Sequence, residues 1–298
     1  MSTELVRVPA LIDAHALMDL RPAPDDTAAD GPLLLDVRWT LAGADRDGYR
    51  AGHVPGAVFV DLDTELAEPP GDGGRHPLPG VERLTALVRR VGVVPGRTVV
   101  VYDGGAGAAA ARAWWCLRWA GHADVRVLDG GLAAWVAAGG TLAMGDVPPR
   151  PAPDAVVVPG QMPVVDADAV LAGAAGALLD ARAPERFRGA TEPVDPVAGH
   201  IPGATSCPTT AVQRADGTYL EPAELRRVLD DALAGADDGS AGGDPGGGGG
   251  AATAYCGSGV TAAQLVLAAH EAGVELALFP GSWSEWIRDP SRPVATGP

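Results

Sequence analysis

Lysine is absent from this sequence: all 22 basic residues are arginines, and 38 acidic residues bring the formal net charge to −16. Without lysine, no mechanism that depends on a lysine Schiff base or a lysine general base is available. The strong negative charge also repels nucleic acid and anionic membrane surfaces, which carry charge of the same sign. We therefore expect neither a nucleic acid nor a membrane among the partners.

Cysteine is scarce as well, and long apolar runs are missing. The three cysteines, at positions 116, 207 and 256, form an odd count in 298 residues, which argues against a disulfide framework and favours a reducing cytoplasm. The sequence does not start with a basic stretch followed by an apolar core, and no apolar run is long enough to span a bilayer. No cysteine and histidine residues have the spacing of metal ligands, so we expect no metal and no other cofactor.

One cysteine stands in a context that suits chemistry. A short apolar run ends at Tyr255, Cys256 follows with glycines at 257 and 259, and an Ala/Leu-rich run comes next, which predicts a strand, a tight loop and a helix. Such a loop lets backbone N–H groups converge on one point, to which the helix N-terminus adds its free donors. This setting favours a thiolate, so Cys256 is the expected nucleophile. An inert buried cysteine is the alternative, but a core strand needs no such loop.

The two halves of the chain carry the same short segments in the same order, at an offset of about 150 residues. The matched pairs are 33–38 with 177–182, 52–57 with 199–204, 99–108 with 252–261, and 130–135 with 281–286. In the third pair Asp103 occupies the position of Cys256. We interpret this as an internal duplication. Because short apolar runs alternate with helical stretches in each copy, it predicts an α/β protein of two tandem domains, each a parallel sheet flanked by helices.

Proline and glycine indicate where the two copies end. Prolines crowd residues 144–163 and oppose both helix and sheet, so we interpret this stretch as a linker. It would join a non-catalytic domain at 1–143 to a catalytic domain at 164–298. Residues 235–250 are rich in glycine and aspartate and are expected to be a disordered insertion before the catalytic strand.

Several motifs recur together in one known family. They are Cys-Gly-Ser-Gly-Val-Thr-Ala at 256–262, Gly-His-x-Pro-Gly-Ala at 52–57 and 199–204, Asp-Gly-Gly-Leu-x-x-Trp at 129–135, and Gly-Ser-Trp-Ser-Glu-Trp at 281–286. With them the chain resembles the tandem rhodanese-type sulfurtransferases over roughly residues 5–293, and its loop resembles that of the 3-mercaptopyruvate branch. The resemblance implies transfer of sulfur from 3-mercaptopyruvate to Cys256 as a persulfide, with release of pyruvate. The sulfur would then pass to a thiol, such as thioredoxin or a small thiol, or to cyanide.

Three alternatives to a 3-mercaptopyruvate sulfurtransferase are an enzyme that uses thiosulfate, a phosphatase and a binding module. Thiosulfate-specific relatives carry two basic residues directly after the cysteine, where this chain has Gly257 and Ser258, so thiosulfate is the second choice of donor. A phosphatase on this fold would need arginine at position 262 to complete Cys-x5-Arg, and Ala262 argues strongly against it. A silent rhodanese-like binding or regulatory module is a third class; Asp103 suits it in the first domain, whereas Cys256 opposes it in the second.

The loop itself supplies most of the expected site. The N–H groups of residues 257–262 are expected to stabilise the persulfide, so Gly257, Gly259, Val260 and Thr261 are counted as substrate-binding. The Thr261 side chain is expected to cap the following helix rather than to react. Ser258 can reach the sulfur or the carbonyl group of the donor.

The donor's carboxylate requires a cation, for which the second half offers Arg186 and Arg188. Arg186 has no arginine counterpart in the first half, and by resemblance it falls on the family's carboxylate-binding arginine. The family's second such arginine, some nine residues later, is missing, because Val194 and Asp195 occupy that area. Binding would then depend on Arg186 alone or borrow Arg188.

Histidine is harder to place. By resemblance, a first-domain histidine backed by an aspartate lies beside Ser258, which implies a relay from Ser258 through His53 to Asp45 or Asp47. The recurrence of His53 as His200 favours a structural role instead. By the same argument the Asp-x-Arg pairs at 36–38 and 180–182 belong to the scaffold. The remaining histidines, at 15, 76, 122 and 270, show no sign of a role beyond surface or packing.

Overall fold

The computed structural model describes residues 8–21, 31–237 and 252–298. Its first half contains a five-stranded sheet in the order β1-β7-β6-β2-β5, in which every pairing is parallel. The strands are β1 (Leu11–Ile12), β2 (Leu33–Asp36), β5 (Val58–Phe59), β6 (Val99–Tyr102) and β7 (Val125–Leu128). The helices are α1 (Ala14–Leu20), α2 (Arg46–Ala51), α3 (Leu62–Glu65), α4 (Val81–Val91), α5 (Ala108–Trp119) and α6 (Gly131–Ala137). A short antiparallel pair, β3 (Trp39–Thr40) with β4 (Gly43–Ala44), follows β2.

The second half repeats this construction with a four-stranded parallel sheet in the order β11-β10-β8-β9. The strands are β8 (Leu178–Asp180), β9 (Ala204–Ser206), β10 (Ala252–Tyr255) and β11 (Leu276–Leu278). The helices are α7 (Ala167–Leu171), α8 (Pro184–Phe187), the 3-10 turn η1 (Thr209–Ala211), α9 (Pro222–Asp237), α10 (Ala262–Ala272) and α11 (Ser282–Trp286). The predicted α/β fold with two parallel sheets flanked by helices is confirmed.

The duplication is visible in the strand order. In the repeat, β2, β5, β6 and β7 correspond to β8, β9, β10 and β11, respectively. Both sets of strands have the same spatial order within their sheets. The edge strand β1 also has a partial counterpart in the second half, because Val164 forms a parallel bridge with Leu278 of β11. In each half the catalytic-type loop therefore leaves the carboxyl end of a central strand, β6 or β10. Open parallel sheets bind their ligands at this end of the strands.

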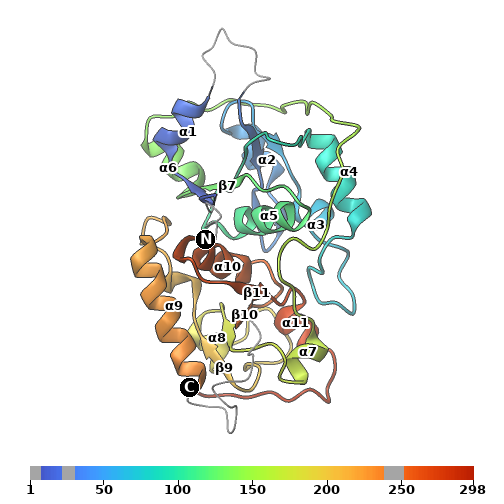
Figure 1. The fold of residues 1–298 in the computed structure, drawn as a ribbon, viewed down its shortest axis with the longest axis vertical. Coiled ribbons are helices and arrows are strands. Elements are labelled where there is room, and N and C mark those ends of the chain that lie inside the picture. Colours follow the sequence, from blue (N-terminus) through green and yellow to red (C-terminus); the bar gives the residue numbers. More distant parts are fainter. Residues whose placement is uncertain (1–7, 22–30, 238–251) are drawn as a thin grey trace, which may run out of the picture.

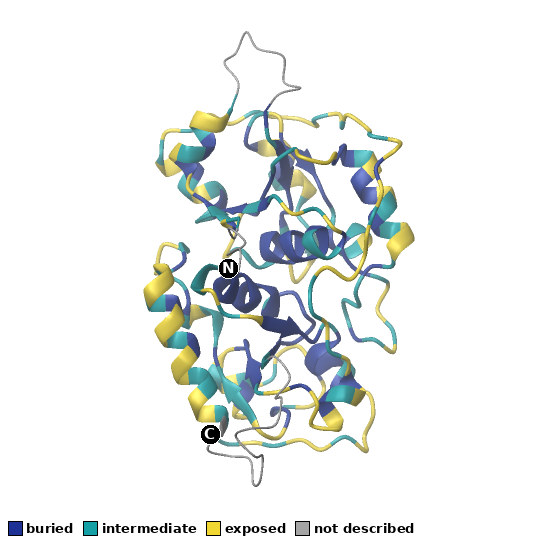
Figure 2. Ribbon diagram, in the orientation of Figure 1, coloured by how far each residue is buried: buried dark blue, intermediate teal, exposed yellow. Residues whose placement is uncertain are grey.

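Helices α5 and α10 lie against each other where the two halves meet (Figure 1). Residues 109–117 of α5 and 262–270 of α10 are all buried, and both helices are dark along their length in Figure 2. A helix that is apolar on all sides must be covered on all sides, which explains the composition of both segments. The two loops that precede these helices, after Asp103 and at Cys256, are thus held by one shared apolar core.

The segments that connect these elements differ partly from expectation. The proline-rich residues 144–163 form neither helix nor strand and run along the first half, where Val147 N donates to Tyr49 Oη (3.0 Å) and Val158 N to the Ala120 carbonyl (2.9 Å). Residues 235–237, which the predicted disordered insertion included, belong instead to α9, and Gly235 does not end that helix. Residues 238–250 lie outside the described residues. None of the described helices is long and apolar enough to cross a membrane.

Candidate active site

Cys256 lies at the carboxyl end of β10, and α10 begins six residues later at Ala262. The cysteine is buried and borders a pocket of about 460 Å³. Both halves of the chain contribute to the walls of this pocket: Trp39, Leu41 and Arg75 come from the first, whereas Arg186 and the 256–261 loop come from the second. The candidate active site is therefore a cleft between the halves.

The backbone around Cys256 is fixed by its neighbours. Its N–H donates to Ser282 Oγ (3.0 Å), and its carbonyl accepts from Trp283 N (3.0 Å). Gly259 has φ = +73°, and a Cβ built there would collide with the Pro280 carbonyl oxygen. Only glycine meets both conditions, which explains its place in the loop.

The equivalent loop of the first half binds the side chain of its own Asp103. The carboxylate of Asp103 accepts four backbone hydrogen bonds, from Gly105 (3.0 Å), Gly107 (3.1 Å), Ala109 (3.1 Å) and Ala110 (3.2 Å). A ring of N–H groups at a helix N-terminus is a typical anion site. Here the side chain at the nucleophile position fills it.

The loop of the second half keeps three of the four equivalent donors open, whereas the fourth, Ala263 N, donates to the Val260 carbonyl (3.2 Å). Ser258, Val260 and Ala262 are the counterparts of residues 105, 107 and 109, and their N–H groups donate to no other residue that the structure describes. Cys256 is shorter than aspartate by one heavy atom and does not reach them. The cradle can therefore hold an anion that begins at the cysteine sulfur.

Ser258 is hydrogen-bonded to a histidine of the first half. His76 Nδ1 lies 2.8 Å from Ser258 Oγ, and His76 Nε2 lies 3.3 Å from Asp63 Oδ1. Burial lowers the pKa of His76 below its usual value, and the charges of Arg112 and Arg75 lower it further, against the opposing effect of Asp63. The ring is accordingly neutral at neutral pH. With its Nε2–H donating to Asp63 Oδ1, the neutral ring has Nδ1 available to accept a hydrogen bond from the Ser258 hydroxyl.

This geometry corrects the expectation for His53, which is wrong. His53 is fully buried, its Nδ1–H donates to the Tyr49 carbonyl (2.9 Å), and its ring stacks on Tyr49 with the centroids 4.3 Å apart. Its Nε2 makes no hydrogen bond to any described residue. His200 makes the same contacts with Phe187, at 2.8 Å and 3.8 Å. Both histidines pack a turn of the scaffold, as their recurrence indicated.

The aspartates proposed behind His53 are also placed elsewhere. Asp45 caps α2 by accepting from Gly48 N (2.9 Å), and Asp47 is exposed, 3.6 Å from Arg50. The aspartate that contacts the site histidine is Asp63, at the start of α3, which also accepts from Trp39 Nε1 (2.9 Å). The sequence carried one overlooked signal: His76 has no histidine counterpart in the second half, the same criterion that singled out Arg186.

The two arginines expected to bind the carboxylate are separated by the structure. Arg186, on α8, borders the pocket and pairs with Glu192 (2.7 Å) and Asp195 (3.1 Å). Arg188 is exposed, pairs with Glu185 (3.3 Å) and does not border the pocket. The idea that Arg188 is borrowed is therefore not supported. Thr261 borders the pocket but makes no capping hydrogen bond with its side chain, contrary to expectation.

A buried arginine that the sequence did not reveal links the two halves of the site. Arg112, on α5, is fully buried and donates to four carbonyl groups: Leu66 (3.2 Å), His76 (3.1 Å), Pro77 (3.2 Å) and Gly259 (3.2 Å). One guanidinium thus connects the His76 loop to the Cys256 loop. The histidine and the serine thus belong to loops that share one donor.

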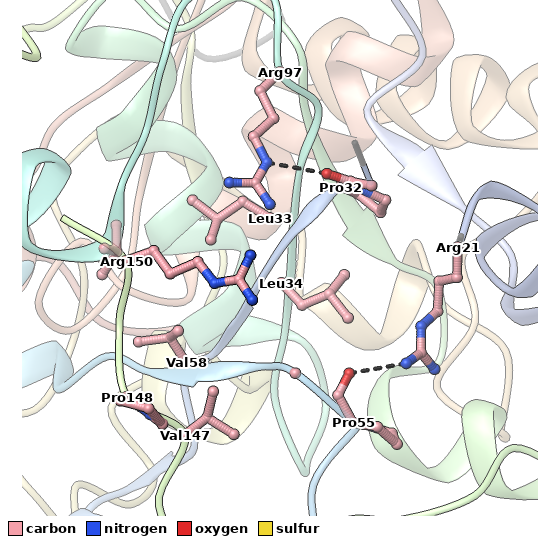
Figure 3. Close-up of a pocket in the computed structure, with 13 residues that line it drawn as sticks. Arg21, Pro32, Leu33, Leu34, Pro55, Val58, Arg97, Val147, Pro148 and Arg150 are labelled. Atoms are coloured by element: carbon pink, nitrogen blue, oxygen red, sulfur yellow. Dashed lines mark hydrogen bonds between the residues drawn. The ribbon is translucent and has the colours of Figure 1, made fainter. Parts of the chain in front are cut away.

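Figure 3 shows a different pocket, of about 380 Å³, at the opposite end of the first sheet. Arg21, Arg97 and Arg150 surround an apolar floor, and two of them donate to carbonyl groups of Pro55 (3.0 Å) and Gly31 (3.0 Å). This pocket contains no nucleophile. Nor do the described residues include a group of three or more His, Cys, Asp or Glu side chains that could hold a metal ion. The chemistry of the described chain therefore concentrates at Cys256.

Comparison with known proteins identifies relatives over most of the chain. The family model of the rhodanese-like domain matches residues 11–138 and 166–289. A Mycobacterium tuberculosis protein named "Putative thiosulfate sulfurtransferase SseB" is 49% identical over 277 residues, which cover 91% of this chain and 93% of that protein. The "Probable 3-mercaptopyruvate sulfurtransferase" of Pseudomonas aeruginosa is 45% identical over 274 residues, covering 89% and 92%. The solved structure of 3-mercaptopyruvate sulfurtransferase from Leishmania major superposes with a TM-score of 0.74 at 29% identity, covering 87% of this chain and 72% of that one.

Proposed function

The chain belongs to the rhodanese family and is a sulfurtransferase, and from that premise we propose that its donor is 3-mercaptopyruvate and that Cys256 carries the sulfur as a persulfide. The observation that supports this donor is the chain of contacts from Ser258 through His76 to Asp63. A donor that is both a thiol and a ketone needs a proton moved during transfer. Thiosulfate, which releases sulfite, needs none.

The first half-reaction uses the loop and this relay together. The Cys256 thiolate attacks the donor sulfur, the carbon–sulfur bond breaks, and its electron pair leaves as the enolate of pyruvate. The proton of the donor thiol is the one that the enolate carbon requires to become a methyl group. Ser258 and His76, hydrogen-bonded at 2.8 Å, are positioned to take that proton and return it.

The second half-reaction begins from the persulfide. Its outer sulfur is anionic, and the open N–H groups of Ser258, Val260 and Ala262 suit that charge as those of the first loop suit Asp103. A thiolate acceptor or cyanide then attacks the outer sulfur, and Cys256 leaves as the thiolate. The acceptor thus ends with the sulfur, and the cysteine returns to its starting state.

The other cysteines are poor competitors for this role. Burial raises the pKa of Cys207 to about 11 and also raises that of Cys116 above its usual value. Both therefore stay protonated at neutral pH, and a protonated thiol is a weak nucleophile. Neither borders the pocket that contains Cys256.

Thiosulfate remains the second candidate donor because of one structural observation. The loop residues supply no cation, but Arg75 and Arg186 approach Gly257 from outside the loop. The sequence predicted no cation at positions 257 and 258, and these two guanidinium groups, paired with Glu192 and Asp195, lie beside the loop from other segments. The relative at 49% identity also bears the thiosulfate name.

One experiment tests the proposal. Release of pyruvate from 3-mercaptopyruvate and of sulfite from thiosulfate are measured side by side, with Cys256→Ser, Cys116→Ser and Cys207→Ser as variants. We expect faster turnover of 3-mercaptopyruvate, loss of it only in Cys256→Ser, and a gain of one sulfur mass at Cys256 after exposure to donor. A preference for thiosulfate would replace the donor, and full activity in Cys256→Ser would remove the persulfide mechanism at this residue. Absence of turnover with both donors in the unmodified protein would favour a binding module.

A further inference from the structure

The pocket at the opposite end of the first sheet is lined by three arginines and by no acidic side chain that the structure describes (Figure 3). The arginines are Arg21, Arg97 and Arg150, and apolar side chains of β2, β5 and residues 147–148 form most of the remaining wall. Its volume is about 380 Å³. Small-molecule sites commonly have this form, a mostly apolar hollow of roughly 300–1,000 Å³ with a few polar groups that orient the ligand.

Two of these arginines have no acidic partner among the described residues. Arg97 donates only through Nε, to the Gly31 carbonyl (3.0 Å), and the side chain of Arg150 donates to no residue that the structure describes. In Figure 3 both side chains extend toward Leu33 and Leu34 on the pocket floor. Burial lowers the pKa of Arg97, and the charge of Arg150 lowers it further. Two like charges therefore lie near each other, and the described chain supplies no counter-charge.

This pair of arginines contrasts with the charge of the chain as a whole. With 38 acidic residues for 22 arginines, carboxylates are abundant. Buried Arg182 and partly buried Arg90 each pair with one, at 2.6 Å and 2.7 Å. A guanidinium group that loses water without gaining a counter-charge is destabilised, and a neighbouring like charge adds to the cost. An anion from solution would supply the missing charge.

We propose that this pocket binds a small phosphorylated molecule with an apolar body, whose phosphate group lies between Arg97 and Arg150. A phosphate monoester carries a charge of about −1.5 to −2 at neutral pH and has three acceptor oxygens, which suit two guanidinium groups better than the single charge of a carboxylate. The apolar body packs against β2 and β5. Arg21 adds positive charge at the rim, where its Nη2 donates to the Pro55 carbonyl (3.0 Å) and its guanidinium lies 5.4 Å from the centroid of the Trp135 ring. The site is independent of the sulfur donor.

Titration calorimetry of the full chain with phenyl phosphate tests the proposal. Inorganic phosphate keeps the anionic head without the body, and phenylacetate keeps the body with a single charge. Each should bind about tenfold more weakly than phenyl phosphate, because one lacks the apolar contact and the other the second charge. Arg150→Met should raise the Kd of phenyl phosphate about tenfold, and Arg97→Met combined with it should raise that Kd further. Because the Arg150 side chain holds no described hydrogen bond, Arg150→Met should keep the melting temperature and the sulfurtransferase turnover of the unmodified protein.

Arg186→Met is the matched control, because Arg186 borders the cleft at Cys256, the other place where an anion could bind. This variant should leave the Kd of phenyl phosphate within about twofold, since its site is remote from the pocket. If Arg186→Met weakens the binding and Arg150→Met does not, the ligand lies in the cleft and the inference is overturned.

Three further results would overturn it as well. The first is absence of phenyl phosphate binding, and the second is equally tight binding of phenylacetate or inorganic phosphate. The third concerns Asp25, Asp26 and Asp30, which lie in a segment outside the described residues. Binding that appears only after these three aspartates are replaced by asparagine would show that the chain's own carboxylates neutralise the arginines.

Discussion

Two histidines of the first domain allow a sharp test of the site, because one belongs to the relay and the other to the scaffold. His76→Ala removes the contacts to Ser258 (2.8 Å) and Asp63 (3.3 Å), and with them the proton transfer. General acid–base catalysis contributes about 10²- to 10⁴-fold, so kcat with 3-mercaptopyruvate should fall by about that factor. The ring is partly exposed rather than fully buried, and the free energy of unfolding should fall by only about 1 kcal/mol.

His53→Ala should give the opposite pattern. It removes a fully buried ring stacked 4.3 Å from Tyr49, and a hydrogen bond of 2.9 Å to that residue's carbonyl. A cavity of this kind together with a lost hydrogen bond costs about 2–4 kcal/mol of unfolding free energy. The folded fraction should nevertheless turn over within about twofold of the unmodified protein, because nothing at Ser258 changes.

Pyruvate release gives kcat, and denaturant unfolding followed by tryptophan fluorescence gives the free energy of unfolding on the same samples. The reasoning is refuted if His53→Ala abolishes turnover without loss of stability. It is refuted equally if His76→Ala retains kcat within a few-fold of the unmodified protein.

Three further predictions follow from the same contacts. Because burial holds the pKa of His76 below its usual value of 6.5, kcat/KM should stay level down to that pH and fall only at more acidic pH. A fall of kcat/KM already at neutral pH would contradict this, and so would an unchanged acidic side of the pH profile in His76→Ala. Gly259→Ala should reduce both turnover and melting temperature, because its Cβ collides with a carbonyl, whereas Gly105→Ala, which has open space, should do neither. Arg112→Met should lower both kcat and the melting temperature, because four carbonyl groups lose their donor. Arg227→Met, which replaces an exposed arginine, is the matched control. Equal kcat and melting temperature in the two variants would refute the role of Arg112 in linking the two loops.

The sequence predicted what depends on neighbouring residues. The strand, loop and helix around Cys256 follow from consecutive residues 252–263, and the repeated segments predicted the second sheet from the first. The internal repeat also separated scaffold from site correctly for His200, which packs on Phe187. For His53 the resemblance was given precedence over the repeat, and the structure shows that the repeat was the better guide.

What the sequence did not predict comes from contacts between distant segments. His76 meets Ser258 across 182 residues, and Arg112 meets Gly259 across 147. Arg75 reaches Asp195 across 120 residues. All three residues belong to the first domain. Arg75 and His76 lie in a connection whose sequence has no regular pattern, and Arg112 lies in α5, whose sequence is typical of a buried helix. No local periodicity encodes which face of one domain meets the other, because residues 109–117 of α5 and 262–270 of α10 are buried on every side.

The carboxylate of Asp103 has a consequence for how the two domains share the work of a catalytic cycle. Its four backbone hydrogen bonds keep the first loop permanently occupied, so that loop experiences no change when donor arrives or sulfur departs. In the proposed mechanism, the second loop alone alternates between vacant and filled. The side chain at one position, a carboxylate at 103 and a thiol at 256, thus distinguishes a stationary loop from a cycling one. The stationary domain contributes His76 and Arg112, which its twin lacks, to the site of the other.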